Sequence, residues 1–72
     1  MAELTHRQYD MLEHAIAQGR RLSVYRRGTE YVVVPTSFAI RAGRETLETI
    51  HPTTGAHLTL YVDEIDGIEM VG

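Results

Sequence analysis

Residues able to recognise an anionic or aromatic partner gather in one short stretch, residues 19–28, which reads GRRLSVYRRG. Guanidinium groups pair with carboxylates and phosphates in a planar, bidentate way, and a tyrosine beside them adds a stacking surface. Leu22 and Val24 alternate with polar residues, which predicts a half-buried strand with both apolar side chains inward. The outer face then carries Arg21, Ser23, Tyr25 and Arg27. We predict a contact surface made of Arg21, Tyr25 and Arg27, with Arg20 and Arg26 as supporting charges.

The distribution of charge indicates the kind of partner. The formal net charge is -3, all seven basic residues are arginines within residues 1–44, and residues 45–72 hold six acids and no base. An acidic half repels a long polyanion, so we expect a protein partner and place RNA or single-stranded DNA second. A simpler interpretation also stays open, in which the arginines keep a strand soluble and discourage edge pairing.

A second charged group, the acidic cluster of Asp63, Glu64 and Asp66, is the alternative contact surface. Its spacing is not that of a calcium-binding loop. A turn explains Asp66-Gly67, whereas a docking surface for a basic partner would explain the cluster as a whole. The sequence leaves open which of the two charged groups meets the partner.

Residues for catalysis or metal binding do not form a complete set. The chain has no cysteine, which excludes disulfides, thiolate zinc sites and cysteine nucleophiles. His51 and His57 flank a turn and, with Glu48, would make a possible metal site, although two surface histidines on a loop explain them more simply. We therefore expect no catalytic residue, no metal and no cofactor, and a binding module rather than an enzyme.

The N-terminal segment has the signals of a helix. Thr5 and Gln8 have the spacing of a capping box, in which each side chain bonds the other residue's amide. Tyr9, Leu12 and Ile16 recur at helical spacing, and Gly19 suits a left-handed C-terminal cap. These signals predict a helix over about residues 5–18.

Short strands joined by tight turns follow the helix. Pro35 is expected to end a strand or to lie in a bulge, because it cannot donate to a ladder. The expected strands are 21–25, 29–35 with 37–40 as a short continuation, 45–50, 57–62 and 68–71, with 63–67 as a tight connection. Since the connections are too short for parallel crossovers, the sheet should be antiparallel. We predict a mainly β (α+β) fold, in which the helix covers one open side of a five-stranded SH3-like or Sm-like barrel.

Length and composition predict one domain over residues 1–72. No signal peptide and no apolar run of about 20 residues is evident, so we expect no membrane span, and the absence of cysteine favours a cytoplasmic protein. A domain this small needs a closed core, self-association or a partner, so an oligomer stays open.

The order of motifs resembles the WYL-type regulatory domain of bacterial transcription factors. The matching pieces are LEHAIAQGRRLSVY, YVVVP, AGRETLETIHPTTGAHL and YVDEIDGI, which span about residues 12–70. The resemblance implies an Sm-like fold and a regulatory role. The name-giving Trp-Tyr-Leu is Glu45-Thr46-Leu47 here, so no ligand residue is carried over.

The chain also resembles Rof, the small Sm-like inhibitor of the Rho termination factor. YDMLEHA matches the N-terminal helix of that family and LYVDEIDGI matches its closing segment. This second resemblance implies a small bacterial or phage regulator that acts near transcription through protein contact.

Overall fold

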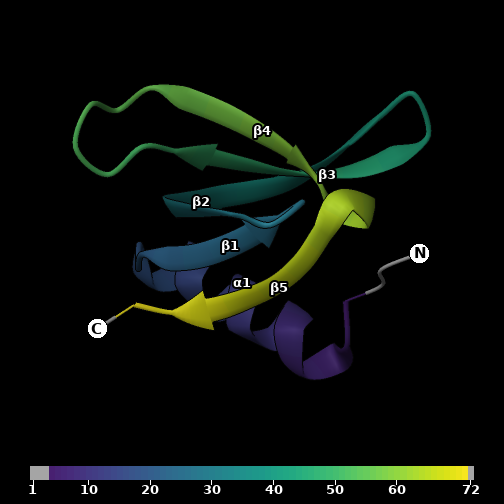
Figure 1. The fold of residues 1–72 in the computed structure, drawn as a ribbon, viewed down its shortest axis with the longest axis horizontal. Helices are drawn as coiled ribbons and strands as arrows, with labels where there is room; N and C mark the ends of the chain where they lie inside the picture. Colours follow the sequence, from purple (N-terminus) through teal and green to yellow (C-terminus); the bar gives the residue numbers. More distant parts are fainter. Residues whose placement is uncertain (1–3, 72) are drawn as a thin grey trace.

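One helix followed by five antiparallel strands makes up the fold (Figure 1), which confirms the predicted α+β class. The computed structural model describes residues 4–71, so residues 1–3 and 72 of the predicted domain lie outside the described part. The elements are α1 (His6–Gln18), β1 (Leu22–Arg26), β2 (Thr29–Arg41), β3 (Arg44–Ile50), β4 (His57–Tyr61), the 3-10 turn η1 (Val62–Glu64) and β5 (Ile65–Met70).

The helix α1 begins and ends at the predicted signals. The amide of Gln8 donates to Thr5 Oγ1 at 3.2 Å, and the amide of Thr5 donates to Gln8 Oε1 at 2.8 Å, which is the capping box. Gly19 has φ 64° and takes the left-handed cap, where a side chain would be strained. The helix therefore begins one residue later than expected, because Thr5 is its cap.

The strand β2 is continuous across Pro35, so of the two expected alternatives the bulge is the one that occurs. The register with β3 slips between Pro35 and Ser37, so a bulge accommodates the missing amide. The first part of β2 pairs with β1 and the second part with β3. The strand order β4-β3-β2-β1-β5 follows, with β2 at its centre.

The last strand begins earlier than expected, and the barrel is not closed. Residues 63–67, expected to be a connection, instead divide between η1 and β5, because Ile65 pairs with Arg26 and is buried in the core. The strands β4 and β5 lie at opposite edges of the order, and within residues 4–71 no ladder joins them. The result is a strongly bent open sheet rather than a complete barrel (Figure 1).

The core lies between the bent sheet and α1. Leu12 and Ala15 are fully buried on the helix, and they pack with residues of every strand: Leu22, Val24, Val33, Leu47, Leu60, Ile65 and Ile68. The Tyr9 ring lies 5.8 Å from the Phe38 ring, and its hydroxyl donates to Glu45 Oε1 at 2.6 Å. The helix thus covers one side of the sheet, as predicted.

Leu12→Ala should cost about 2–5 kcal/mol of unfolding free energy, because it leaves a cavity at a fully buried site. Such a loss is a large share of the stability of a small domain. Urea unfolding followed by circular dichroism measures it. His14→Ala, an exposed position on the same helix, is the control and should change little. Equal midpoints for the two variants would show that α1 contributes nothing to the core.

Two hairpin turns hold non-glycine residues in the left-handed region. Arg27 and Gly28 have φ 50° and 77°, and Ala42 and Gly43 have φ 50° and 78°. Two-residue turns with positive φ at both positions match the twist of the flanking strands and favour Asn-Gly. Arg27 and Ala42 are therefore strained positions in otherwise well-suited turns.

Ala42→Asn should raise the free energy of unfolding by about 1 kcal/mol, since asparagine tolerates this conformation better than alanine. The same change at Ala17, exposed on α1, should lower it, because asparagine is a poorer helix former. Thermal unfolding of both variants measures whether each change raises or lowers the stability. A loss of stability at both sites would contradict the turn assignment.

Candidate functional site

The structure divides the predicted contact residues between the two ends of β1. Arg20 and Arg21 precede the strand, whereas Arg26 is its last residue and Arg27 lies in the following turn. A strand rises about 3.3 Å per residue, so Arg21 and Arg27 are separated by roughly 20 Å of chain. The expected alternation also stops before Arg27, because the turn begins there. Arg21, Tyr25 and Arg27 therefore do not share one continuous face.

The arginines at the turn end of β1 lie against the acidic cluster. Arg26 Nε is 3.9 Å from Glu64 Oε1, and an Arg27 guanidinium nitrogen is 3.7 Å from Glu64 Oε2. The backbone amide of Arg27 donates to Asp66 Oδ2 at 3.0 Å. The guanidinium of Arg26 also lies over the Tyr31 ring, 5.5 Å from its centroid. The basic and acidic candidates thus neutralise each other at this end.

A third arginine, Arg44 of β3, completes this network. Its Nε and a terminal nitrogen donate to the two oxygens of Asp63 at 3.1 and 2.7 Å, and the same terminal nitrogen reaches Glu64 at 3.4 Å. Hydrogen bonding to Arg44 lowers the pKa of Asp63, and the same bonds raise the pKa of Arg44. The Arg44 guanidinium also lies 3.9 Å from the Tyr61 ring centroid. Asp63 and Glu64 are therefore paired with arginines, whereas Asp66 remains exposed.

The outer face of β1 around Tyr25 is acidic. Ser23 is buried and donates to Glu30 Oε2 at 2.7 Å, and Glu30 lies opposite Tyr25 on β2. Partial burial raises the pKa of the Tyr25 hydroxyl, and the charges of Glu30 and Glu69 raise it further. A phosphate backbone stacked against Tyr25 would meet two carboxylates.

The two arginines that precede β1, Arg20 and Arg21, have different surroundings from the arginines at its end. Arg20 and Arg21 are exposed, and neither forms an ion pair with any residue in the range 4–71. Their backbone is held in place, because the Arg20 amide donates to Ala15 O at 2.9 Å and the Arg21 carbonyl accepts from Val71 N at 3.4 Å. These two side chains are available on a fixed backbone.

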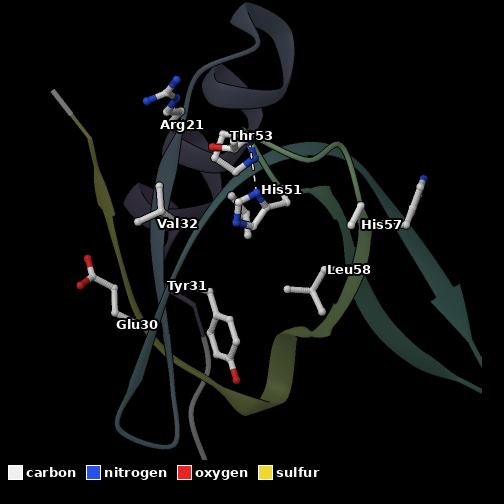
Figure 2. A pocket seen from close by; sticks show the side chains of 11 residues that line it. Arg21, Glu30, Tyr31, Val32, His51, Thr53, His57 and Leu58 are labelled. Carbon is white, nitrogen blue, oxygen red and sulfur yellow. Dashed lines mark hydrogen bonds between the residues drawn. The ribbon is translucent and has the colours of Figure 1, made fainter.

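A pocket of about 610 Å³ lies beside Arg21. Tyr31 of β2 and Leu58 of β4 lie on facing sides of it, with His51 between them (Figure 2). Its lining comprises Arg21, Glu30, Tyr31, Val32, Val33, His51, Pro52, Thr53, Ala56, His57 and Leu58. Sequence reasoning missed this pocket, because it forms between segments about 20 residues apart. The only sequence signals were the apolar run of β2 and the histidines flanking the loop.

The histidines do not assemble the metal site considered from the sequence. His51 Nδ1 accepts from the amides of Thr53 and Thr54 at 3.1 and 3.2 Å, so that nitrogen is used by its own loop. His57 points away from His51 (Figure 2), and Glu48 is bonded elsewhere, by Thr46 and Thr59. No group of three potential metal-binding side chains occurs in the described part of the chain.

Glu48 of β3, which the sequence suggested only as a metal ligand, is a nearly buried carboxylate held by hydrogen bonds. It is only 9% exposed, and Thr59 Oγ1 and Thr46 Oγ1 donate to its two oxygens at 3.0 and 3.1 Å. Arg41 Nε lies 3.5 Å from it. The hydrogen bond from Thr59 lowers the pKa of Glu48 most, burial acts in the opposite direction, and Thr46 and Arg41 lower the pKa further, so the pKa stays below its usual value.

Comparison with known proteins adds no family to this description. Neither the models of known families, nor the curated protein sequences, nor the solved structures contain a match to the chain. Among residues 4–71, no helix is long and apolar enough to cross a membrane.

Glu48→Gln should destabilise the protein at pH 7 and matter less in acid. Because the folded-state pKa of Glu48 is lowered, its stabilisation is complete above the ordinary value of 4.5 and is lost as the pH falls through the folded-state pKa. Urea unfolding of wild type and variant at several pH values measures the difference. Glu13→Gln, an exposed carboxylate on α1, is the control. A difference between wild type and Glu48→Gln that is the same at pH 7 and at about pH 3 would contradict this role.

Proposed function

We propose that the protein is a small non-enzymatic binding module that contacts a protein partner through the Arg20–Arg21 end of β1. The observation that carries the proposal is the division of the arginines. Arg26, Arg27 and Arg44 are paired with the acidic cluster, whereas Arg20 and Arg21 are exposed and lack such pairs in the described part of the chain. Unpaired arginines on a fixed backbone beside a pocket are a suitable anchor for an acidic partner surface.

The short resemblances to WYL-type and Rof proteins suggest the setting of this contact. They support a bacterial or phage regulatory protein, in the cytoplasm, that acts near transcription. The protein's own charge is consistent with a protein target, because the net charge of -3 opposes broad attraction to nucleic acid. Tyr25, Arg26 and Arg27, which the sequence also placed in the contact surface, lie toward the far end of β1, where the two arginines hold the β1–β2 turn against Glu64.

Direct binding of RNA or single-stranded DNA is the competing function. It needs phosphate-pairing cations beside a stacking ring. At Tyr25 the neighbours are Glu30 and Glu69, and the arginines that follow Tyr25 are already paired with Glu64. The local charges therefore favour a protein partner over a nucleic acid.

The Arg20→Ala/Arg21→Ala double variant should remain folded and lose its partner. Exposed arginines add little stability, so the midpoint of unfolding should stay within about 1 kcal/mol of wild type. Loss of arginine hot spots should weaken binding by about 2 kcal/mol or more, roughly 30-fold in Kd. The partner retained by tagged wild type in the source cell is identified, purified and titrated against both proteins.

Arg7→Ala, an exposed arginine on α1, is the matched control and should bind as wild type does. Unchanged binding by the folded double variant would refute this surface. A gel shift with single-stranded RNA distinguishes the competing function: a complex that weakens steeply with salt would support nucleic-acid binding and contradict our proposal.

A further inference from the structure

We propose that the pocket beside Arg21 receives an apolar side chain whose neighbouring group is a carboxylate, as at the C-terminal residue of a peptide. This inference rests on the proposed function, and it names the chemistry by which the partner would be held. The pocket volume of about 610 Å³ lies within the usual range for ligand sites, roughly 300–1,000 Å³.

The walls of the pocket are apolar and fixed. Tyr31 and Leu58 are half-buried, and both pack against the buried core cluster, so their inner sides are held while their outer sides line the pocket. Arg26 lies over the Tyr31 ring and restrains it further. Val33, which is almost fully buried, adds apolar surface. An apolar side chain that enters between these walls would be removed from water, and the core side chains would not have to move.

His51 supplies an oriented hydrogen-bond donor to the pocket. Its Nδ1 accepts from two loop amides, so in the neutral ring the proton lies on Nε2. Figure 2 shows the His51 ring above Tyr31 and Leu58 in this view, with the second nitrogen on the side of the ring away from the Thr53 hydrogen bond. The loop thus fixes both the tautomer and the direction of an N–H that suits an acceptor oxygen.

Arg21 makes the mouth of the pocket cationic. Arg21 is one of the residues that line the pocket; its guanidinium extends outward from the rim (Figure 2) and has no ion pair within residues 4–71, and this group prefers the two oxygens of a carboxylate. Glu30 also borders the pocket, but it accepts from Ser23, and Figure 2 shows its carboxylate pointing away from the hollow. The polar groups left for a ligand are therefore an arginine at the rim and a histidine N–H, which complement an anion.

The pocket can be tested on the isolated protein with small probes. N-acetyl-L-phenylalanine carries a carboxylate on an apolar group, and N-acetyl-L-phenylalaninamide is its neutral counterpart. We expect the acid to bind with a Kd on the order of millimolar, given its size. In ¹⁵N–¹H correlation spectra, the amides of residues 31–33 and 51–58 should shift and saturate. The amide probe should bind roughly three- to tenfold more weakly, because it lacks the charge.

Variants assign the binding to the proposed groups. Arg21→Ala and His51→Asn should each weaken the acid roughly three- to tenfold, and the asparagine oxygen can still accept from the loop amides. Arg7→Ala and His14→Ala, at exposed positions on α1, are the matched controls, and both should bind as wild type does. Equal affinity for acid and amide, no saturable shift up to about 10 mM, or an unchanged Arg21→Ala variant would each overturn the inference.

The probe-binding test and the test of the proposed function can each fail without the other. If Arg20→Ala/Arg21→Ala loses the protein partner while the acid never binds, the contact surface stands and the pocket chemistry is wrong. If the acid binds as expected while the double variant keeps its partner, the pocket chemistry stands and the protein contact lies elsewhere.

Discussion

The bulge at Pro35 is the constraint on which the rest of the structure depends. One strand, β2, has to pair with β1 along its first part and with β3 along its second, and the slip between Pro35 and Ser37 lets it bend between the two. This bend curves the sheet beyond its ordinary twist, so that one helix can enclose a core against it. The same bend turns β4 toward the first half of β2, and this brings Leu58 and the loop of residues 51–56 opposite Tyr31.

The charges of the chain are arranged by the same topology. The turn η1 follows β4 and places the acidic cluster beside the start of β3 and the end of β1, where Arg44, Arg26 and Arg27 meet it. Those pairs connect three segments that are distant in sequence. The start of β1 lies at the other end of the strand, away from the acids, which leaves Arg20 and Arg21 unmatched within the described residues. A chain whose net charge is negative can therefore still present a basic site.

Local signals account for what the sequence predicted, and tertiary contacts account for what it missed. The Thr5–Gln8 capping box, Gly19 and the alternation of Leu22 and Val24 depend on neighbours in sequence, so these features were predictable. The early start of β5 at Ile65 was not, because it depends on pairing with Arg26. Likewise, no spacing rule relates Arg27 to Glu64 or Tyr31 to Leu58. The predicted contact residues were divided because the folded chain brings Glu64 against Arg26 and Arg27 and leaves Arg20 and Arg21 at the other end of β1.

The strand order has a consequence for how the molecule opens. The strands β1 and β3 are paired along both edges, whereas β4 and β5 each pair with one strand, and β2 pairs with β1 along its first part and with β3 along its second. Local opening begins where backbone hydrogen bonds are most exposed, so amide hydrogen exchange should be faster in β4 than in β1. The two walls of the pocket lie on different strands, since Tyr31 lies on β2 and Leu58 on β4. Fraying of one edge strand would therefore widen the pocket while the wall on β2 and the helix-covered core stay folded.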